Sequence, residues 1–215
     1  MTNATRFRFT FVLAAMLVYW VAAPLLKPFP GLRIFTDIFF TVTVISAIYA
    51  VGRVRHQWVV AAGLAFPMFV SLWLMHFGAR PALALVGSIF AILFFGYTAW
   101  LILAAVFRAT EVSWEVIAAA LVVYLFLGLI WAGLYSTLEL LSPGSFSMAN
   151  VPTGPTSQQF GYFSYTTLTT LGYGDIVPLS GAARAFATLE AMVGQIYLAV
   201  LIARLVGAHI AHSSK

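Results

Sequence analysis

Long apolar runs separated by short polar breaks make up most of this chain of 215 residues. A helix that rises ~1.5 Å per residue needs about 20 apolar residues to cross the ~30 Å hydrocarbon core of a bilayer. The breaks between the runs contain proline, glycine and charged residues, as turns require. The pattern predicts an all-α integral membrane protein with six transmembrane helices, near residues 8–26, 32–51, 57–78, 82–107, 114–140 and 183–207.

The segment between the fifth and sixth runs departs from this pattern. Residues 142–157 are rich in Ser, Pro, Gly and Asn and predict an exposed loop. Residues 159–169 (QFGYFSYTTLT) are too short to span, and they fit a half-membrane helix whose C-terminal dipole favours a cation at the membrane centre. Irregular backbone at that depth is tolerated only where it lines a cavity or is buried in protein. The sequence therefore predicts a re-entrant pore helix, with a filter loop after it.

The residues that follow the short helix are Thr170-Leu171-Gly172-Tyr173-Gly174-Asp175. Two glycines around one tyrosine allow φ > 0, and alternating left- and right-handed residues turn successive carbonyl groups to one side. Four such strands around an axis would form stacked oxygen rings that replace the hydration shell of a potassium ion. The run resembles the T-x-G-Y-G-D filter of potassium channels. Residues 113–207 resemble their two-helix pore module, and the chain is most similar to prokaryotic ion channels with four helices before that module.

This resemblance implies how the filter residues act. Potassium would bind to the hydroxyl and carbonyl of Thr170 and to the carbonyls of Leu171, Gly172 and Tyr173, while Gly174 would shape the outer mouth. Leu171 stands where the family often has valine, and either residue contributes only a carbonyl. The sequence holds one filter motif and no repeat that would supply another, so a ring of filter strands implies a homotetramer.

Tyr162 and Glu190 are candidates for supporting the filter from behind, through Asp175 or the pore helix. Many family members carry a tryptophan at the position of Tyr162, and it hydrogen-bonds the filter aspartate; interfacial packing is the alternative. Glu190 is a carboxylate within an apolar run, which costs about 3 kcal/mol on insertion scales and marks a functional residue. The family often has a pore-helix glutamate where this chain has Thr166, so we expect Glu190 to replace it. Its expected partners are Thr166, Thr167 and Tyr173.

The sixth run is predicted to be the inner helix of the pore. Gly194 matches the hinge glycine of the family's inner helix, and close helix packing is the alternative. Glycine costs ~1 kcal/mol against alanine inside a helix, so either reason would explain it. Gln195, Leu198 and Ile202 share one helical face and are predicted to line the cavity. Leu198 and Ile202 would form a hydrophobic constriction.

Residues 111–215 thus form the predicted pore domain, and residues 1–110 form a four-helix transmembrane region of unassigned role. In voltage-gated relatives the fourth helix carries arginine at every third position. Residues 82–107 contain no charged residue. We therefore expect a potassium-selective channel that conducts passively as a tetramer, without strong voltage dependence.

Charge supports a membrane location and orients the chain. Charged residues are 8% of the sequence, against about 25% in soluble domains. The net charge of +5 is spread thinly over the breaks, which indicates membrane orientation and excludes nucleic-acid binding. We expect a multi-pass protein of the prokaryotic plasma (inner) membrane with both termini cytoplasmic, in contact with lipids and its own copies. That orientation places seven basic residues inside (Arg6, Arg8, Arg53, Arg55, Arg108, Arg204 and Lys215) and four outside (Lys27, Arg33, Arg80 and Arg184).

A potassium transporter subunit and a non-conducting membrane scaffold are the alternative functions. A transporter would need several filter repeats, broken spanning helices or a pair of membrane carboxylates for ion coupling, and the sequence has none of these. It also lacks HExxH, GxSxG and cysteine, so we expect neither an enzyme nor a cofactor, with potassium ions as the permeant species.

Overall fold

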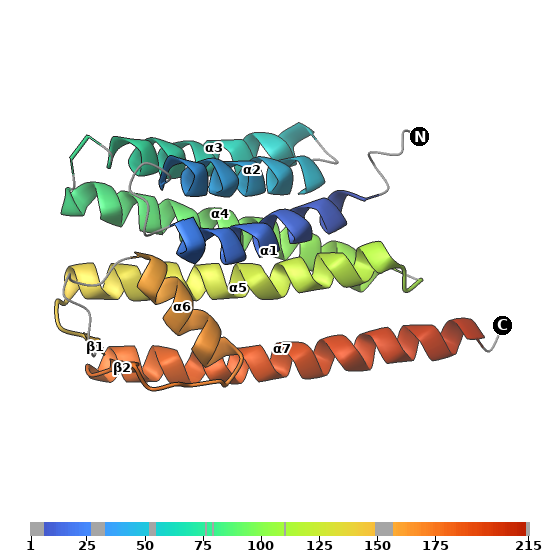
Figure 1. Ribbon diagram of the computed structural model, residues 1–215. Helices are drawn as coiled ribbons and strands as arrows, with labels where there is room; N and C mark the ends of the chain where they lie inside the picture. The colour runs from blue at the N-terminus through green and yellow to red at the C-terminus, as the bar shows by residue number, and fades with distance from the viewer. Residues whose placement is uncertain are drawn as a thin grey trace.

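The computed structural model describes residues 7–26, 33–51, 55–75, 77–78, 80–109, 111–148 and 157–213. In these residues, six long helices run roughly along one direction, and the short helix α6 crosses at an angle beside α5 and α7 (Figure 1). Each predicted run coincides with one of the long helices, and α6 falls on the predicted half-helix. The helices are α1 (Arg8–Leu26), α2 (Arg33–Val51), α3 (Arg55–Leu74), α4 (Pro81–Arg108), α5 (Trp114–Leu141), α6 (Ser157–Leu168) and α7 (Gly181–Ser213).

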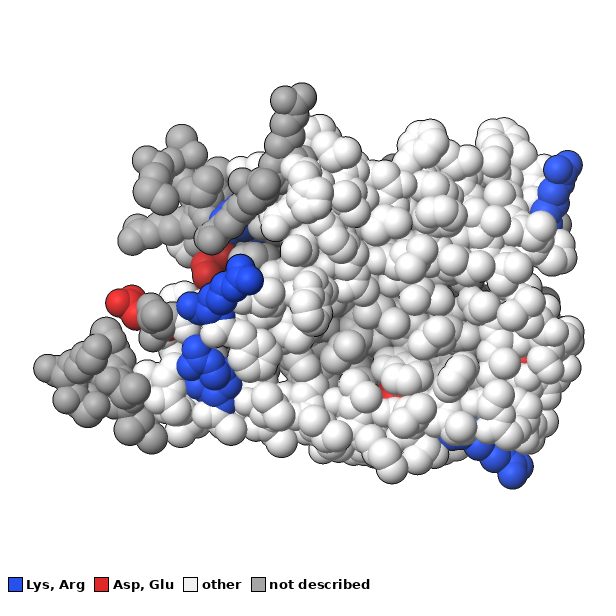
Figure 2. Space-filling model, turned by 180° about the vertical axis from the view of Figure 1, so that it is seen from behind, with Lys and Arg blue, Asp and Glu red and all other residues white. Residues whose placement is uncertain are grey.

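The described helices and the surface charge fit a membrane environment. Four stretches are long and apolar enough to cross a bilayer: His56–Leu74, Pro81–Arg108, Trp114–Leu141 and Gly181–Ala208. The apolar stretches of α1 and α2, Arg8–Ala23 and Asp37–Ala50, are shorter, so the count of six spans stays a prediction. Figure 2 shows Lys and Arg side chains toward the two ends of the molecule, with surface between them that is uncharged except for small acidic spots. Four of the basic residues used to predict the orientation lie outside the described residues: Arg6, Lys27, Arg53 and Lys215.

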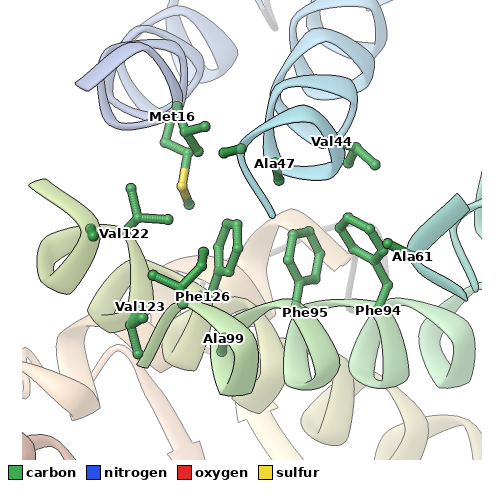
Figure 3. Packing of buried hydrophobic residues seen from close by; sticks show 14 of the residues in the cluster. Met16, Val44, Ala47, Ala61, Phe94, Phe95, Ala99, Val122, Val123 and Phe126 are labelled. Atoms are coloured by element: carbon green, nitrogen blue, oxygen red, sulfur yellow. The ribbon is translucent and has the colours of Figure 1, made fainter. Parts of the chain in front are cut away.

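Buried apolar side chains from α1 to α5 form one cluster, which crosses the predicted domain boundary at residue 110. Phe94 and Phe95 of α4 and Phe126 of α5 lie in a row that faces α1 and α2 (Figure 3). Successive ring centroids in this row are 5.1 Å and 5.0 Å apart, within the range of favourable tilted and edge-to-face contacts. The N-terminal helices therefore share their core with the outer helix of the predicted pore domain.

Two charged side chains join these regions where α5 begins. Glu115 accepts hydrogen bonds from the backbone N–H groups of residues 9–10, at 3.0 Å and 3.2 Å, so a carboxylate caps the positive end of the α1 dipole. Arg204 of α7 donates from Nη2 to the carbonyl oxygens of Phe107 and Ala109, at 3.2 Å and 2.9 Å. A cation thereby caps the negative end of α4.

A smaller cluster at the opposite end surrounds an antiparallel ribbon. Strand β1 (Phe146–Met148) pairs with β2 (Ile176–Pro178), and Phe146 lies opposite Pro178. The ring of Phe146 is 6% exposed and lies 5.0–5.5 Å from three other rings, those of Tyr135, Phe160 and Phe163. The prediction of an exposed loop over residues 142–157 is therefore wrong at 145–146, where aromatic packing and strand pairing bury the chain. Residues 149–156 of that loop lie outside the described residues.

The ribbon leads to a prediction about topology. The N–H of Leu179 donates to the carbonyl of Ser145 at 2.8 Å, so the two ends of the segment between α5 and α7 are held together. Because the chain has no cysteine, single cysteines can report sidedness directly. In sealed vesicles, we expect an impermeant maleimide to label Ser142→Cys and Leu179→Cys from one side and Glu111→Cys from the other. Labelling of residues 142 and 179 from opposite sides would mean that the segment crosses the bilayer.

Candidate functional site

The candidate site begins where α6 ends. The last four carbonyl groups of a helix have no partner within it, and at membrane depth each must find one elsewhere in the protein. All four are paired here, three of them by the residues that follow the helix. The bonds are Thr169 N–H to Tyr165 O (3.1 Å), Gly172 N–H to Thr166 O (3.0 Å), Thr170 N–H to Thr167 O (2.9 Å) and Tyr124 hydroxyl to Leu168 O (3.2 Å).

The sign of φ alternates along the backbone after α6, as the sequence predicts. Thr170, Gly172 and Gly174 have φ of 60°, 55° and 81°, and the residues between them have negative φ. Glycine adopts these angles without steric cost, but Thr170 is β-branched and rarely found there. Left-handed residues at every second position are the geometry that turns successive carbonyl groups of one strand toward the same side.

The filter segment, residues 169–175, runs back beside α7. At its start, the carbonyl of Leu168 lies against Gly194, and at its end the carbonyl of Pro178 accepts a bond from Arg184 Nε at 3.3 Å. Gly194 and Arg184 are ten residues apart, or ~15 Å along a helix, which is about half of the ~30 Å hydrocarbon core. The whole segment is exposed in the single chain, and Leu171 and Tyr173 are 55% and 69% exposed.

Tyr162 and Asp175 meet behind the filter. The Tyr162 hydroxyl makes a side-chain hydrogen bond with the Asp175 carboxylate, the contact that the sequence predicts. Asp175 Oδ1 also accepts the N–H of Ile176 at 3.1 Å. The carboxylate thus ties the pore helix to the point where the filter segment enters β2. Thr166, also on α6, is buried, and its hydroxyl donates to the carbonyl of Phe163.

Glu190 is fully buried between three helices, but its partners differ from those expected. Its Oε2 accepts the Tyr135 hydroxyl at 2.5 Å, and its Oε1 lies 2.5 Å from Ser164 Oγ. Ser164 Oγ also lies 2.7 Å from the carbonyl of Gly128. The expected contacts to Thr166, Thr167 or Tyr173 are not those that the carboxylate makes, because its side chain reaches the middle of α6 and α5 and not the filter. Glu190 therefore links α7 to α6 and α5.

The contacts of Ser164 indicate where the hydrogen atoms of this cluster lie. Ser164 has one hydroxyl hydrogen, yet its oxygen contacts two groups that are both acceptors if Glu190 is ionised. All contacts are satisfied if Glu190 carries a proton on Oε1 and donates it to Ser164, which in turn donates to Gly128. A buried polar network is stable only when every member is paired. The contacts therefore favour a neutral Glu190.

The inner-helix residues occupy two different environments. A Cβ atom on Gly194 would lie 2.4 Å from the carbonyl oxygen of Leu168, so glycine is needed there for close packing. Helix α7 continues unbroken through this point, and a hinge role stays a prediction. Gln195 and Ile202 are exposed in the single chain and Leu198 is half-buried, so the predicted cavity face has few contacts within one chain.

Sequence reasoning missed several side chains that position the pore helix. Tyr165 donates its hydroxyl to the carbonyl of Leu125 at 2.6 Å, and its ring would meet any side chain larger than glycine at Gly128. The same ring lies 4.4 Å from that of Trp20, in an edge-on contact with α1. The hydroxyl groups of Tyr135 and Ser164 were signals in the sequence, because a buried Glu190 needs hydrogen-bond partners. The sequence alone could not identify these two among its many hydroxyl groups, because the choice depends on how the helices pack.

The comparisons with known proteins point to ion channels. Residues 116–209 match the model of a protein family described as "Ion channel". The chain is also 33% identical over 88 residues to "Two pore potassium channel c" from Oryza sativa subsp. japonica, which covers 40% of this chain and 19% of that protein. No solved structure matches the chain.

The fold is that of an all-α, multi-pass integral membrane protein, and residues 116–209 are similar to an ion-channel domain. Residues 116–209 are therefore similar to an ion-channel family, and one of the similar proteins is a potassium channel. These matches point to a channel and not to an enzyme.

The close approach at Gly194 can be tested by adding one methyl group. Gly194→Ala should lower the thermal stability of the purified protein, because the Cβ meets a backbone carbonyl; overpacking of this kind costs about 1–3 kcal/mol. Gly207→Ala on the same helix is the matched control, since a Cβ there has no atom within 4 Å. Melting in detergent should show a lower Tm for Gly194→Ala alone. Equal melting of both variants would contradict the packing role.

The proton count at Glu190 predicts a difference between two substitutions. In Glu190→Gln, the amide oxygen can accept from Tyr135 and the amide nitrogen can donate to Ser164, so stability and the potassium-to-sodium permeability ratio should change little. In Glu190→Ala, both hydroxyl groups lose a buried partner, at about 1–3 kcal/mol each, and Tm should fall. If Glu190→Gln melts as low as Glu190→Ala, the negative charge itself is required.

Proposed function

We propose that this chain is a subunit of a potassium-selective channel that conducts passively as a homotetramer. The observation behind this proposal is the positive φ at residues 170, 172 and 174, which alternates with negative φ at the residues between them. Residues held in rare conformations cost about 1–3 kcal/mol each and cluster at functional sites. Thr170 is such a residue, and carbonyl groups turned to one side are what a dehydrated potassium ion needs. The ion would be held by the Thr170 hydroxyl and carbonyl and by the carbonyls of Leu171, Gly172 and Tyr173.

The proposal of a tetramer rests on two features of the single chain, an incomplete ion site and exposed apolar surface. One filter segment supplies one side of an ion site, so several copies around an axis are needed to complete it. The exposed filter side chains and an apolar face of α7 would then meet neighbouring copies. That face includes Leu189, Met192, Ile196 and Val200, which are between 48% and 62% exposed.

The remaining parts of the pore follow from the same assembly. The exposed Gln195 and Ile202 would line the cavity below the filter, and Leu198 and Ile202 would narrow it. Helix α4 carries no charge between Pro81 and Phe107, so the pore would lack the sensor of voltage-gated relatives. We propose cytoplasmic termini, which places the ribbon of β1 and β2 outside.

Reconstituted protein with potassium on one side of a bilayer and sodium on the other tests this function. A channel should give discrete unitary currents whose reversal potential lies toward that of potassium. Saturating flux without unitary steps would indicate a transporter, and no flux would indicate a scaffold; either result would overturn the proposal.

The substitution Gly172→Ala tests whether the currents depend on the backbone conformation of the filter segment. At φ +55° an alanine Cβ costs about 1–2 kcal/mol in each chain, so we expect lost conduction or lost potassium selectivity. Gly161→Ala is the matched control, because Gly161 lies on α6 with no positive φ, and a Cβ there has no atom within 4 Å. Selectivity that survives Gly172→Ala unchanged would exclude these carbonyl groups as the ion site.

A further inference from the structure

An apolar groove of about 440 Å³ lies between α4, α5 and α7, away from the filter. This volume is within the ~300–1,000 Å³ range of small-molecule sites. Its walls include Trp100 of α4 and Ile196 of α7, which are 71% and 62% exposed, so the groove opens on the surface of the chain. Leu127 of α5 also lines it. Among the residues that line it, Arg204 alone is charged.

The groove has the length of one membrane leaflet. Along α7 its lining extends from Val193 to Arg204, which is ~16 Å at the helical rise, and one leaflet is half of the ~30 Å hydrocarbon core. Arg204 lies ~35 Å along α7 from Gly181, so it reaches the interface opposite to the one at which α7 begins. The apolar part of the groove therefore lies at acyl-chain depth and its charged end at headgroup depth.

Arg204 can bind an anion without leaving its place. Its Nη2 donates to the carbonyls of Phe107 and Ala109, which fixes the side chain at the end of α4. A guanidinium has five N–H donors in a fixed fork, so Nε and Nη1 supply donors beyond these two bonds. Arg108, exposed at the end of α4, adds a second positive charge next to Phe107. The nearby Glu115 carboxylate is bound to the first turn of α1.

We propose that this groove binds an anionic phospholipid, with one acyl chain between α4, α5 and α7 and the phosphate on Arg204. The match of groove length to leaflet thickness and the single guanidinium at its headgroup end favour this occupant. Such a lipid would contact both the N-terminal region and the inner helix, and so would strengthen the packing between them. The inference rests on the membrane-embedded fold and does not require that the chain conducts ions.

A second copy of the chain is the competing occupant, because Ile196 also belongs to the face assigned above to neighbouring copies. Mass distinguishes the two occupants, because a bound lipid adds the mass of one lipid and a second copy adds the mass of a whole chain. Native mass spectrometry of the delipidated, full-length protein reports both the number of chains and the number of lipids bound.

The probes are phosphatidylglycerol and phosphatidylcholine, added separately. For Arg204→Gln we expect phosphatidylglycerol affinity to fall about fivefold, the effect of one basic residue near the lipid surface, with phosphatidylcholine unchanged. Arg184→Gln is the matched control, because Arg184 lies at the other end of α7 and also donates to a backbone carbonyl. It should leave both lipids unchanged.

A second variant fills the groove and leaves the arginine in place. Gly96 lines the groove and a Cβ there has no atom within 4 Å, so Gly96→Leu should fold and reduce the binding of both lipids. Gly63→Leu, on α3 with equal space, should have no effect. Unchanged lipid binding in Arg204→Gln and Gly96→Leu would overturn the proposal. Fewer chains per particle in Gly96→Leu, with lipid binding unchanged, would assign the groove to a second copy.

Discussion

The need to pair every backbone polar group away from water governs the site of this protein. Helix α6 ends at Leu168, which is fully buried, so its last carbonyl groups must find partners within the protein. Three of these groups are paired by N–H groups of the filter segment itself, and the fourth by Tyr124. The bond from Gly172 N–H to Thr166 turns this N–H toward the helix, away from the position that an ion would take. One set of hydrogen bonds thus ends the helix and begins the filter.

The same constraint explains the residues that surround α6. A short helix with a polar end has little apolar surface of its own, so its position depends on contacts from several elements. Ser164 reaches Glu190 on α7 and Gly128 on α5, and Tyr165 reaches Leu125 on α5 and packs on Trp20 of α1. The N-terminal region therefore contacts the pore helix directly. Since Glu115 and Arg204 also bind α1 and α4 to α5 and α7 at the other end, the N-terminal region contacts the predicted pore domain in two places.

Much of the fold could be predicted from the sequence because hydrophobicity alone locates most of its helices. Apolar runs of spanning length and punctuating Pro and Gly mark the long helices, and the glycines at 172 and 174 predict the alternating backbone. The sequence could not predict β1, because Phe146 is a lone aromatic in a polar stretch until its partners from α5 and α6 are placed. The sequence showed that Glu190 needs hydrogen-bond partners but could not select Tyr135 and Ser164 over the threonines of α6. That choice depends on helix rotation, which hydrophobicity constrains weakly in a chain that is 62% apolar.

The strain at Thr170 and the exposure of the filter have a common consequence. A β-branched residue at φ +60° is unfavourable by itself, and within one chain the filter segment has hydrogen bonds to α6 but little buried surface. Within the chain, the bonds from Thr170 N–H to Thr167 O and from Gly172 N–H to Thr166 O offset part of this strain. In the proposed assembly, ions between the carbonyl groups and neighbouring copies against Leu171 and Tyr173 would offset more of it. Apolar burial within the chain would then fix the helices, and the assembly would complete the order of the filter segment.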